Sequence, residues 1–203
     1  MNGWVLLKEI LIATRNEGKA REFRAFFASK GFKVSTLNDL KDVPPITENG
    51  KTFAENALIK AQALTTALKT TTLADDSGLM VRALGGRPGI YSARYAGDHD
   101  DATNNAKLLR ELTGVPEKQR DAVFHTTLAV TSPVHQPLIV EGEVSGLILE
   151  KPRGRDGFGY DPLFYLPALQ KTFAQLTPAQ KNQVSHRGRA IQKLAEVFDE
   201  WWG

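Results

Sequence analysis

The chain alternates short apolar runs with longer amphipathic segments, which is the pattern of an α/β protein. The apolar run at residues 10–13 predicts a buried strand. Phe23, Phe26 and Phe27 then recur at helical spacing, and Gly31 is expected to end that helix. A further strand is predicted to follow the glycine. The order strand, helix, strand predicts a β-α-β unit at the start of the fold.

A second helix is predicted to begin behind Thr52, because Thr52 and Glu55 have the spacing of a capping box. Four apolar positions of that helix fall on roughly one face: Leu58, Ala61, Leu64 and Leu68. The apolar segment 71–74 predicts a strand that ends at Asp75 and is followed by a turn at Ser77-Gly78.

The second half of the chain repeats these signals. A helix is expected over about residues 102–112, and two extended stretches at 122–130 and 138–149 are predicted to form an antiparallel pair. Glycines make 154–159 a loop, and Thr177-Pro178 is a helix start. A last helix carries apolar residues at Ile191, Leu194, Ala195 and Phe198. The pattern predicts one α/β domain over residues 1–203, with a mixed sheet and a short extension at 1–9.

Composition limits the class of protein. The 203 residues suffice for one sizeable core, and no apolar run approaches the roughly 18–20 residues that span a bilayer. The first residues lack the features of a signal peptide, and the absence of cysteine suits the cytoplasm. The net charge of +3 and the pI near 9.1 come from scattered basic residues, with one cluster at 151–155. That cluster would suit a small polyphosphate as well as RNA.

The loop from Thr14 to Lys19 is a candidate anion site. It joins a predicted strand to a helix N-terminus, where backbone N–H groups and the helix dipole favour negative charge. Lys19 adds a positive charge, and Thr14 and Asn16 add neutral donors. The loop lacks the leading glycine and the final Ser or Thr of a Walker A loop. A plain connection with a solvated lysine is the alternative.

Four carboxylates stand near these loops. Strand alternation sends the side chains of Asp75 and Asp76 to opposite faces, so they should not form one close acid pair. Glu55 is expected to be structural because it can close the capping box, which leaves Glu48 as the freer acid. Asp76 with a distant acid would meet the needs of Mg²⁺, which takes one or two carboxylates plus water and phosphate oxygens.

Two further stretches carry candidate binding residues. Phe158 lies between glycines, so its ring could stack on a flat ligand, and Asp161 could accept hydrogen bonds from a base or a ribose. His186 and Arg187 together offer several donors for a carbonyl oxygen or a phosphate. The alternatives are a glycine-rich turn with its aromatic rings in the core, and an ordinary histidine that is either satisfied within the protein or solvated.

Taken together, these stretches resemble the inosine triphosphate pyrophosphatase family. The resemblance runs from about Ile10 to Phe198. It rests on six motifs in the family's order: ATRNEGK at 13–19, TFAENA at 52–57, ADDSGL at 74–79, PGIYSAR at 88–94, GFGYDP at 157–162 and SHRG at 185–188.

The resemblance implies an elongated α/β fold whose central mixed sheet is flanked by helices. It implies a homodimer, without membrane attachment or stable nucleic-acid binding, that hydrolyses dITP, ITP and XTP to the monophosphate and pyrophosphate with Mg²⁺. By match, Asp76 is the catalytic residue and a metal ligand, Glu48 is the second metal ligand, and Ser77 touches the substrate. By the same match, the residues that bind the triphosphate are Thr14, Arg15, Asn16, Glu17, Gly18 and Lys19. The residues that bind the nucleoside are Phe158, Gly159, Tyr160, Asp161, Lys181, His186 and Arg187.

The chain departs from the family pattern at two places. Arg15 stands where Gly or Lys is common, and Ala179-Gln180 replaces an acidic pair before Lys181. A pyrophosphatase for modified pyrimidine nucleotides and a nucleotide- or RNA-binding module without turnover are the alternatives to this function. The exposed loop 85–95 is the predicted dimer contact.

Overall fold

The computed structural model describes residues 8–97 and 100–203. It confirms the α/β class and the mixed sheet. The described residues form two compact units. The first unit comprises residues 8–75, 128–140 and 194–203, and the second comprises 76–97, 100–127 and 141–193. The single domain over residues 1–203 stays a prediction, and the extension predicted at residues 1–9 lies mostly outside the described residues.

The helices and strands follow the predicted order closely. The strands are β1 Glu9–Ile12, β2 Lys33–Thr36, β3 Thr72–Val81, β4 Asp121–Thr131, β5 Leu138–Ile148, β6 Phe164–Leu166 and β7 Lys171–Thr172. The helices are α1 Glu17–Ser29, α2 Phe53–Leu68, α3 Asp101–Glu111, α4 Pro178–Val184 and α5 His186–Trp202.

The strands form one sheet in the order β2-β1-β3-β4-β5-β6-β7. Strand β1 pairs in parallel with both β2 and β3, which confirms the predicted β-α-β unit. Strand β6 pairs antiparallel with β5 and with β7. Strands β4 and β5 are neighbours, as the two extended stretches predict.

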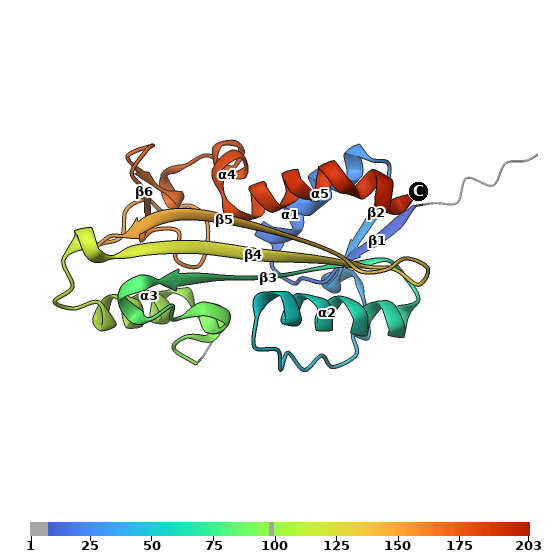
Figure 1. The fold of residues 1–203 in the computed structure, drawn as a ribbon, viewed down its shortest axis with the longest axis horizontal. Coiled ribbons are helices and arrows are strands. Elements are labelled where there is room, and N and C mark those ends of the chain that lie inside the picture. Colours follow the sequence, from blue (N-terminus) through green and yellow to red (C-terminus); the bar gives the residue numbers. More distant parts are fainter. Residues whose placement is uncertain (1–7, 98–99) are drawn as a thin grey trace, which may run out of the picture. The chain divides into compact units, whose positions relative to one another are not determined.

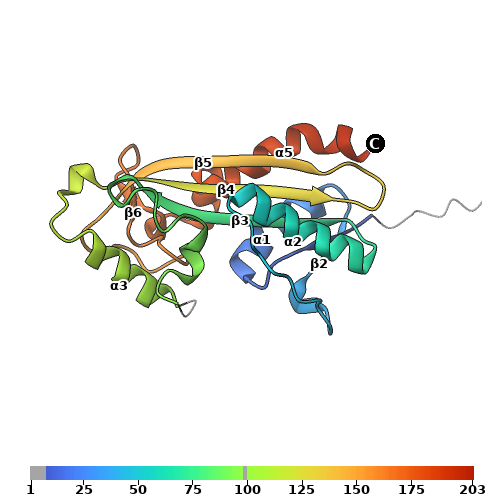
Figure 2. The same cartoon turned by 60° about the horizontal axis from the view of Figure 1, so that its bottom comes forward.

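In the first unit, helices cover both faces of the strands. Helix α2 packs through Ala57, Ala61 and Leu64 against β1, β3 and β4, and Figure 2 shows it running beside them. On the opposite side, α1 and the end of α5 lie together in Figure 1. Phe27 of α1 meets Phe198 of α5 with ring centroids 5.3 Å apart. The helical spacing of these residues therefore explains the layers of this unit.

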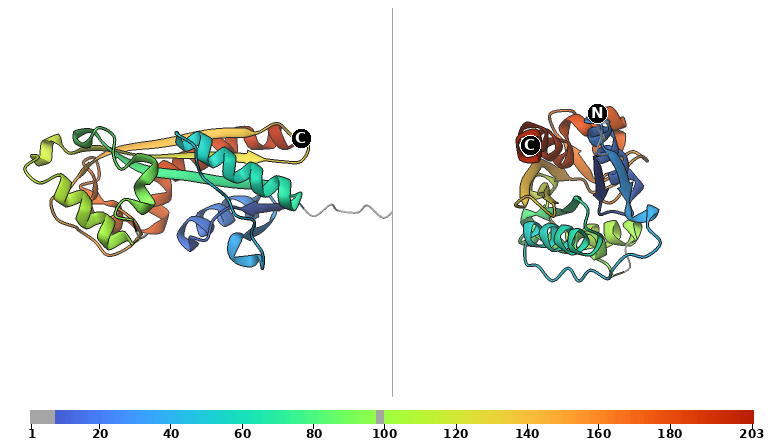
Figure 3. Two further views of the ribbon diagram at one scale, coloured as in Figure 1. Left: turned by 90° about the horizontal axis from the view of Figure 1, so that it is seen from below. Right: turned by 90° about the vertical axis from the view of Figure 1, so that its right-hand side faces the viewer.

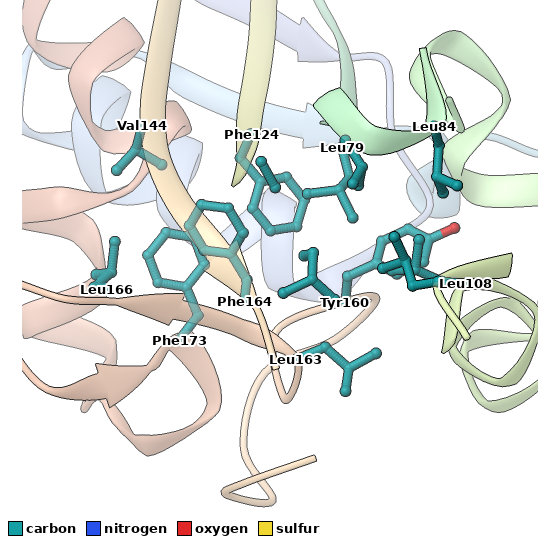
Figure 4. Packing of buried hydrophobic residues seen from close by; sticks show 14 of the residues in the cluster. Leu79, Leu84, Leu108, Phe124, Val144, Tyr160, Leu163, Phe164, Leu166 and Phe173 are labelled. Atoms are coloured by element: carbon teal, nitrogen blue, oxygen red, sulfur yellow. The ribbon is translucent and has the colours of Figure 1, made fainter. Parts of the chain in front are cut away.

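The core of the second unit is built from large aromatic and aliphatic side chains (Figure 4). Phe124 of β4 lies 4.7 Å from Phe164 and 5.7 Å from Phe173, measured between ring centroids. Leu79 of β3 and Leu108 of α3 close the same cluster. This core fixes β3, β4 and the residues around β6, which carry most of the predicted nucleoside residues.

One local prediction is wrong. Strand β3 does not end at Asp75 but continues to Val81, so the Ser77-Gly78 turn does not form. The strand continues because Leu79 and Val81 are fully buried, and tertiary packing outweighs the local turn signal. The predicted last helix is confirmed as α5, in which Ala190, Leu194 and Phe198 are buried and Ala195 is exposed.

The start of α2 is capped nearly as predicted. Thr52 Oγ1 accepts from the N–H of Glu55 at 3.1 Å. The Glu55 carboxylate accepts from the N–H of Lys51 at 2.6 Å, one residue before the position that a capping box uses. Glu55 is thus structural, as expected.

Thr52→Ala should cost about 1 kcal/mol in the free energy of unfolding, since it leaves a first-turn N–H without its side-chain acceptor. Urea unfolding followed by tryptophan fluorescence measures this loss. Thr66→Ala is the control, because Thr66 is an exposed residue of the same helix. Equal losses in the two variants would contradict the capping role.

No helix of the described residues combines the length and apolar character required to cross a membrane.

Candidate active site

In the first unit, the loop before α1 has the local structure of an anion site. Asn16 is the N-cap, and its side-chain oxygen accepts from the N–H of Lys19 at 3.0 Å. Thr14 Oγ1 accepts from the N–H of Asn16 at 3.1 Å. Helix geometry leaves the N–H groups of Glu17 and Gly18 without an intrahelical acceptor. The loop therefore presents donors at the positive end of a helix dipole.

Two charged residues of this loop lie on its outer side. Glu17 is exposed, and the pKa of its carboxyl is lowered by a hydrogen bond from Asn38 and by Arg24. Arg15 donates to the carbonyl of Leu37 at 3.3 Å. This contact directs the guanidinium of Arg15 toward the backbone that follows β2.

Lys19 is held by a buried carboxylate. Its ammonium lies 2.7 Å from Asp75 Oδ2, and the Asp75 side chain is only 2% exposed. The Lys19 side chain keeps 21% of its surface exposed, so its charge can still meet a ligand. Asp75 thus fixes a cation of the candidate phosphate loop.

Glu48 belongs to a segment anchored on α2. The N–H of Gly50 donates to the side chain of the buried Asn56 at 2.9 Å. Glu48 Oε1 lies 3.2 Å from the ammonium of Lys60, which also donates to the carbonyl of Asp75 at 3.3 Å. Sequence reasoning missed Lys60, although a lysine within the predicted second helix was visible.

The described residues contain no group of three or more His, Cys, Asp or Glu side chains arranged to hold a metal ion. Separate carboxylates such as Glu48 and Asp76 suit Mg²⁺, whose remaining ligands are water and phosphate oxygens. The donor chemistry therefore fits the expected cofactor.

In the second unit, β3 presents Asp76 and Ser77 in extended conformation. Asp76 is half-buried. Ser77 Oγ lies 2.7 Å from Thr126 Oγ1 of β4, and it accepts from Arg187 Nη2 at 3.4 Å. Because side chains alternate along a strand, Ser77 and Asp76 point to opposite faces of β3. Ser77 is thereby tied to the predicted nucleoside residues.

The centre of the nucleoside cluster is a buried ion pair. The ammonium of Lys181 forms a short contact with Asp161 Oδ2, and both side chains are at least nine-tenths buried. Asp161 Oδ2 also accepts from the N–H of Phe158 at 2.9 Å. Burial raises the pKa of the Asp161 carboxyl, and Lys181 partly offsets this effect. The pair thus ties the loop after β5 to α4.

Two cations lie near the ring of Phe158. Lys181 Nζ is 4.5 Å from the ring centroid, and the guanidinium carbon of Arg187 is 5.8 Å away. Phe158 remains half-buried rather than lost in the core. The contacts hold the ring by cation–π attraction, so it is positioned for stacking.

His186 and Arg187 begin helix α5. The N–H of Gly188 donates to Ser185 Oγ at 3.0 Å, which caps this helix. The His186 ring stacks on Phe124 with centroids 4.8 Å apart and planes 9° apart. Arg187 is 1% exposed. Both side chains are thus held by the core. His186 is therefore not a solvated histidine, and its stacking on Phe124 also agrees with the alternative of an ordinary satisfied histidine.

Tyr160 is directed into the core instead. Its hydroxyl donates to the carbonyl of Ser92 at 2.8 Å, and burial raises its pKa well above the usual range. For this residue the alternative interpretation, an aromatic side chain folded inward from a glycine-rich turn, describes the geometry.

Three polar residues that contact the nucleoside cluster were missed by sequence reasoning. Thr126 meets Ser77, and Asp101 and Asn105 of α3 meet Gly159. The pair Asp101 and Asn105 has the i, i+4 spacing of one helix face, but nothing in the sequence indicates which loop that face meets.

Comparison with known proteins finds one family that matches nearly the whole chain. The model of the Ham1 family matches residues 10–197. A dITP/XTP pyrophosphatase of Lactiplantibacillus plantarum is 57% identical over 193 residues, which cover 95% of this chain and 96% of that protein. A dITP/XTP pyrophosphatase of Geobacillus kaustophilus is 57% identical over 195 residues, covering 96% of each chain.

Solved structures of similar proteins superpose on nearly the whole chain. The Staphylococcus aureus Ham1 protein superposes with a TM-score of 0.86 at 43% identity, over 95% of this chain and 99% of that one. A nucleoside-triphosphatase / dITP/XTP pyrophosphatase of Mycobacterium abscessus superposes with a TM-score of 0.75 at 41% identity, over 92% and 98% of the two chains.

Proposed function

Since the chain belongs to the Ham1 family, we propose that it hydrolyses non-standard purine nucleoside triphosphates (dITP, ITP and XTP) to the monophosphate and pyrophosphate. Removing these nucleotides keeps deaminated purines out of DNA and RNA. The observation that carries the proposal is the buried cluster of Asp161, Lys181 and Arg187 around Phe158. Buried charges are costly, so a cluster of three beside a half-exposed ring is typical of a binding site rather than of a core.

The proposed phosphate residues are Thr14, Arg15, Asn16, Glu17, Gly18 and Lys19. Support comes from the N-cap of α1 and from the Lys19–Asp75 contact, which hold donors and a cation at the helix N-terminus. The proposed nucleoside residues are Phe158, Gly159, Tyr160, Asp161, Lys181, His186 and Arg187. Support for Phe158, Asp161, Lys181 and His186 is the network of buried contacts described above. Tyr160 is included on the family motif alone, because its hydroxyl binds the carbonyl of Ser92.

The proposed reaction begins with water. Its oxygen forms a bond to the α-phosphorus, and the bond from that phosphorus to the oxygen bridging to the β-phosphate breaks. Pyrophosphate leaves with the bridging oxygen, and we assign the proton of the attacking water to the Asp76 carboxylate. Ser77, tied to Thr126 and Arg187, is proposed to contact the substrate.

We further propose Mg²⁺ as the cofactor, with Asp76 and Glu48 as its carboxylate ligands. When bound, it would supply positive charge against the charge developing on the phosphate oxygens. A homodimer and a cytoplasmic location are proposed from the family resemblance. The loop 85–95, with Tyr91 more than half exposed, is the proposed dimer contact.

The test is pyrophosphate release from ITP, dITP, XTP, GTP, ATP and a modified pyrimidine triphosphate, each with and without Mg²⁺. We expect release from the first three only, and only with Mg²⁺. Preference for the pyrimidine substrate would transfer the chain to the alternative class of pyrophosphatase. Nucleotide binding without turnover of any substrate would indicate the binding module.

Arg187→Ala should lower kcat/KM for ITP more than for ATP, by a further tenfold or so. The purine 6-keto oxygen accepts hydrogen bonds, whereas the 6-amino group of adenine donates them, so only ITP loses a favourable contact worth about 1–3 kcal/mol. The measurement is the kcat/KM ratio of the two substrates.

Arg189→Ala is the matched control. It removes an exposed arginine of the same helix that donates to the carbonyl of Glu143 instead. It should leave the ratio unchanged. Equal losses for ITP and ATP in Arg187→Ala would contradict the selectivity role of this residue.

A further inference from the structure

We propose that Asp101 and Asn105 of α3 are positioning residues, which hold the loop carrying Phe158 in its nucleoside-binding conformation. The inference rests on the proposed function, because it assigns these residues to the affinity of the same site. Neither residue belongs to the motifs that carry the family resemblance.

Both polar groups of the Gly159 backbone are bound by α3. Its N–H donates to Asp101 Oδ2 at 2.6 Å, and its carbonyl accepts from Asn105 Nδ2 at 2.8 Å. In the left view of Figure 3 the loop passes close to α3. The two side chains are four residues apart, so they share one helix face and act on one glycine.

The orientation of the Asn105 amide follows from this contact. A carbonyl can only accept, so the Asn105 nitrogen must face Gly159. The other amide atom, Asn105 Oδ1, is buried without a hydrogen-bond partner among the described residues. An unsatisfied buried oxygen lowers the stability of the folded protein. We therefore expect Asn105 to contribute by holding the loop in position and not by increasing the free energy of unfolding.

Gly159 is a residue whose backbone conformation these two hydrogen bonds can determine. Its φ is +61°, in the left-handed region, and a Cβ built there would meet no atom within 4 Å. Space therefore does not fix the conformation of this glycine. The hydrogen bonds from α3 to the N–H and the carbonyl of Gly159 hold its backbone instead of packing.

Phe158 is thereby held from two sides. Asp161 accepts from its N–H at 2.9 Å, and α3 holds the next residue. The Phe158 ring lies 4.5 Å from Lys181 Nζ, so its place in the cluster depends on the path of the backbone that the α3 contacts hold. Loss of the α3 contacts should therefore weaken substrate binding while leaving the reacting groups intact.

Four substitutions test the two contacts. Asn105→Asp keeps the size but replaces the donor by a carboxylate facing a carbonyl, so the KM for ITP should rise about tenfold or more, while kcat stays within about twofold. Asn105→Ala should raise KM about threefold. Asp101→Ala should also raise KM, whereas Asp101→Asn retains an acceptor for the Gly159 N–H and should restore a value near wild type.

Asp100→Ala is the matched control. Asp100 caps α3 by accepting from Ala102 and Thr103, and none of the hydrogen bonds among the described residues joins its side chain to the loop. Its loss should lower the melting temperature and leave KM unchanged. A second readout is hydrogen exchange of the peptide spanning residues 157–163, which should speed up in Asn105→Asp and Asp101→Ala but not in Asp100→Ala.

The outcomes separate this inference from the proposed function. If wild type releases no pyrophosphate from ITP, the proposed function fails. If wild type is active and KM in Asn105→Asp and Asp101→Ala stays at the wild-type value, the positioning role is overturned. A parallel rise of KM in Asp100→Ala would also overturn it, since helix stability alone would then account for the effect.

Discussion

Asp76→Asn should lower kcat for ITP by about 10²–10⁴-fold, the range expected when a general base is removed. The asparagine side chain has the same size but accepts no proton and carries no charge for a divalent cation. Because Asp76 lies within extended β3 and is half-buried, the isosteric change should leave the fold intact. Pyrophosphate release at saturating ITP and Mg²⁺ measures the effect.

Asp75→Asn is the informative comparison, since it changes the neighbouring residue of the same strand. Asp75 Oδ2 lies 2.7 Å from Lys19. Neutralising it should weaken the hold on a phosphate-loop cation, so KM should rise more than kcat falls. A turnover of Asp76→Asn within tenfold of wild type would contradict the catalytic role of Asp76. A larger loss of kcat in Asp75→Asn would assign that role to Asp75 instead.

Elements set by periodicity could be predicted from the sequence. Helix α2 begins behind its Thr52 cap, and α3 lies within a residue of its predicted bounds, because apolar spacing and capping are local properties. The same holds for α4, which begins at Pro178 as predicted, behind the N-cap Thr177 and inside a capping box that Gln180 completes. Such signals need no knowledge of the tertiary fold.

The strand through the two aspartates shows where local reasoning fails. Asp, Ser and Gly favour turns because of their own side-chain and backbone chemistry. At Ser77 the competing influence is a partner 49 residues away, Thr126, whose hydroxyl lies 2.7 Å from Ser77 Oγ. Leu79 then buries completely. Neither contact leaves a trace in the residues around Asp76.

The candidate site shows the same division. The family resemblance assigned Asp161 and Lys181 to the nucleoside, yet their spacing could not reveal that they form a buried pair. Asp101 and Asn105 could not be found at all, because their partner Gly159 is reached only through the fold. Sequence patterns identify reactive residue types, whereas the residues that orient them depend on long-range packing.

Lys181→Met should destabilise the protein by roughly 3–5 kcal/mol, the cost of removing one member of a buried ion pair. Methionine fills much of the same volume, so the loss reports charge rather than a cavity. Without the ammonium, Asp161 keeps the burial that raises its pKa but loses the cation that opposes it. The folded state should then bind its proton up to a higher pH than the unfolded state does.

The sign of the pH dependence follows from that difference. A carboxyl whose folded pKa lies above its unfolded value contributes stability at low pH, and this contribution declines as pH rises above the unfolded value near 3.8. Lys181→Met should therefore lose more stability at pH 8 than at pH 5, measured by urea unfolding.

The double variant Lys181→Met/Asp161→Asn keeps an acceptor for the Phe158 N–H without a charge. It should regain stability and lose the pH dependence, yet retain low pyrophosphate release, because the cation beside the Phe158 ring is still missing. A loss in Lys181→Met below 1 kcal/mol that is the same at both pH values would contradict a charged pair, and recovery of activity in the double variant would remove Lys181 from the binding site.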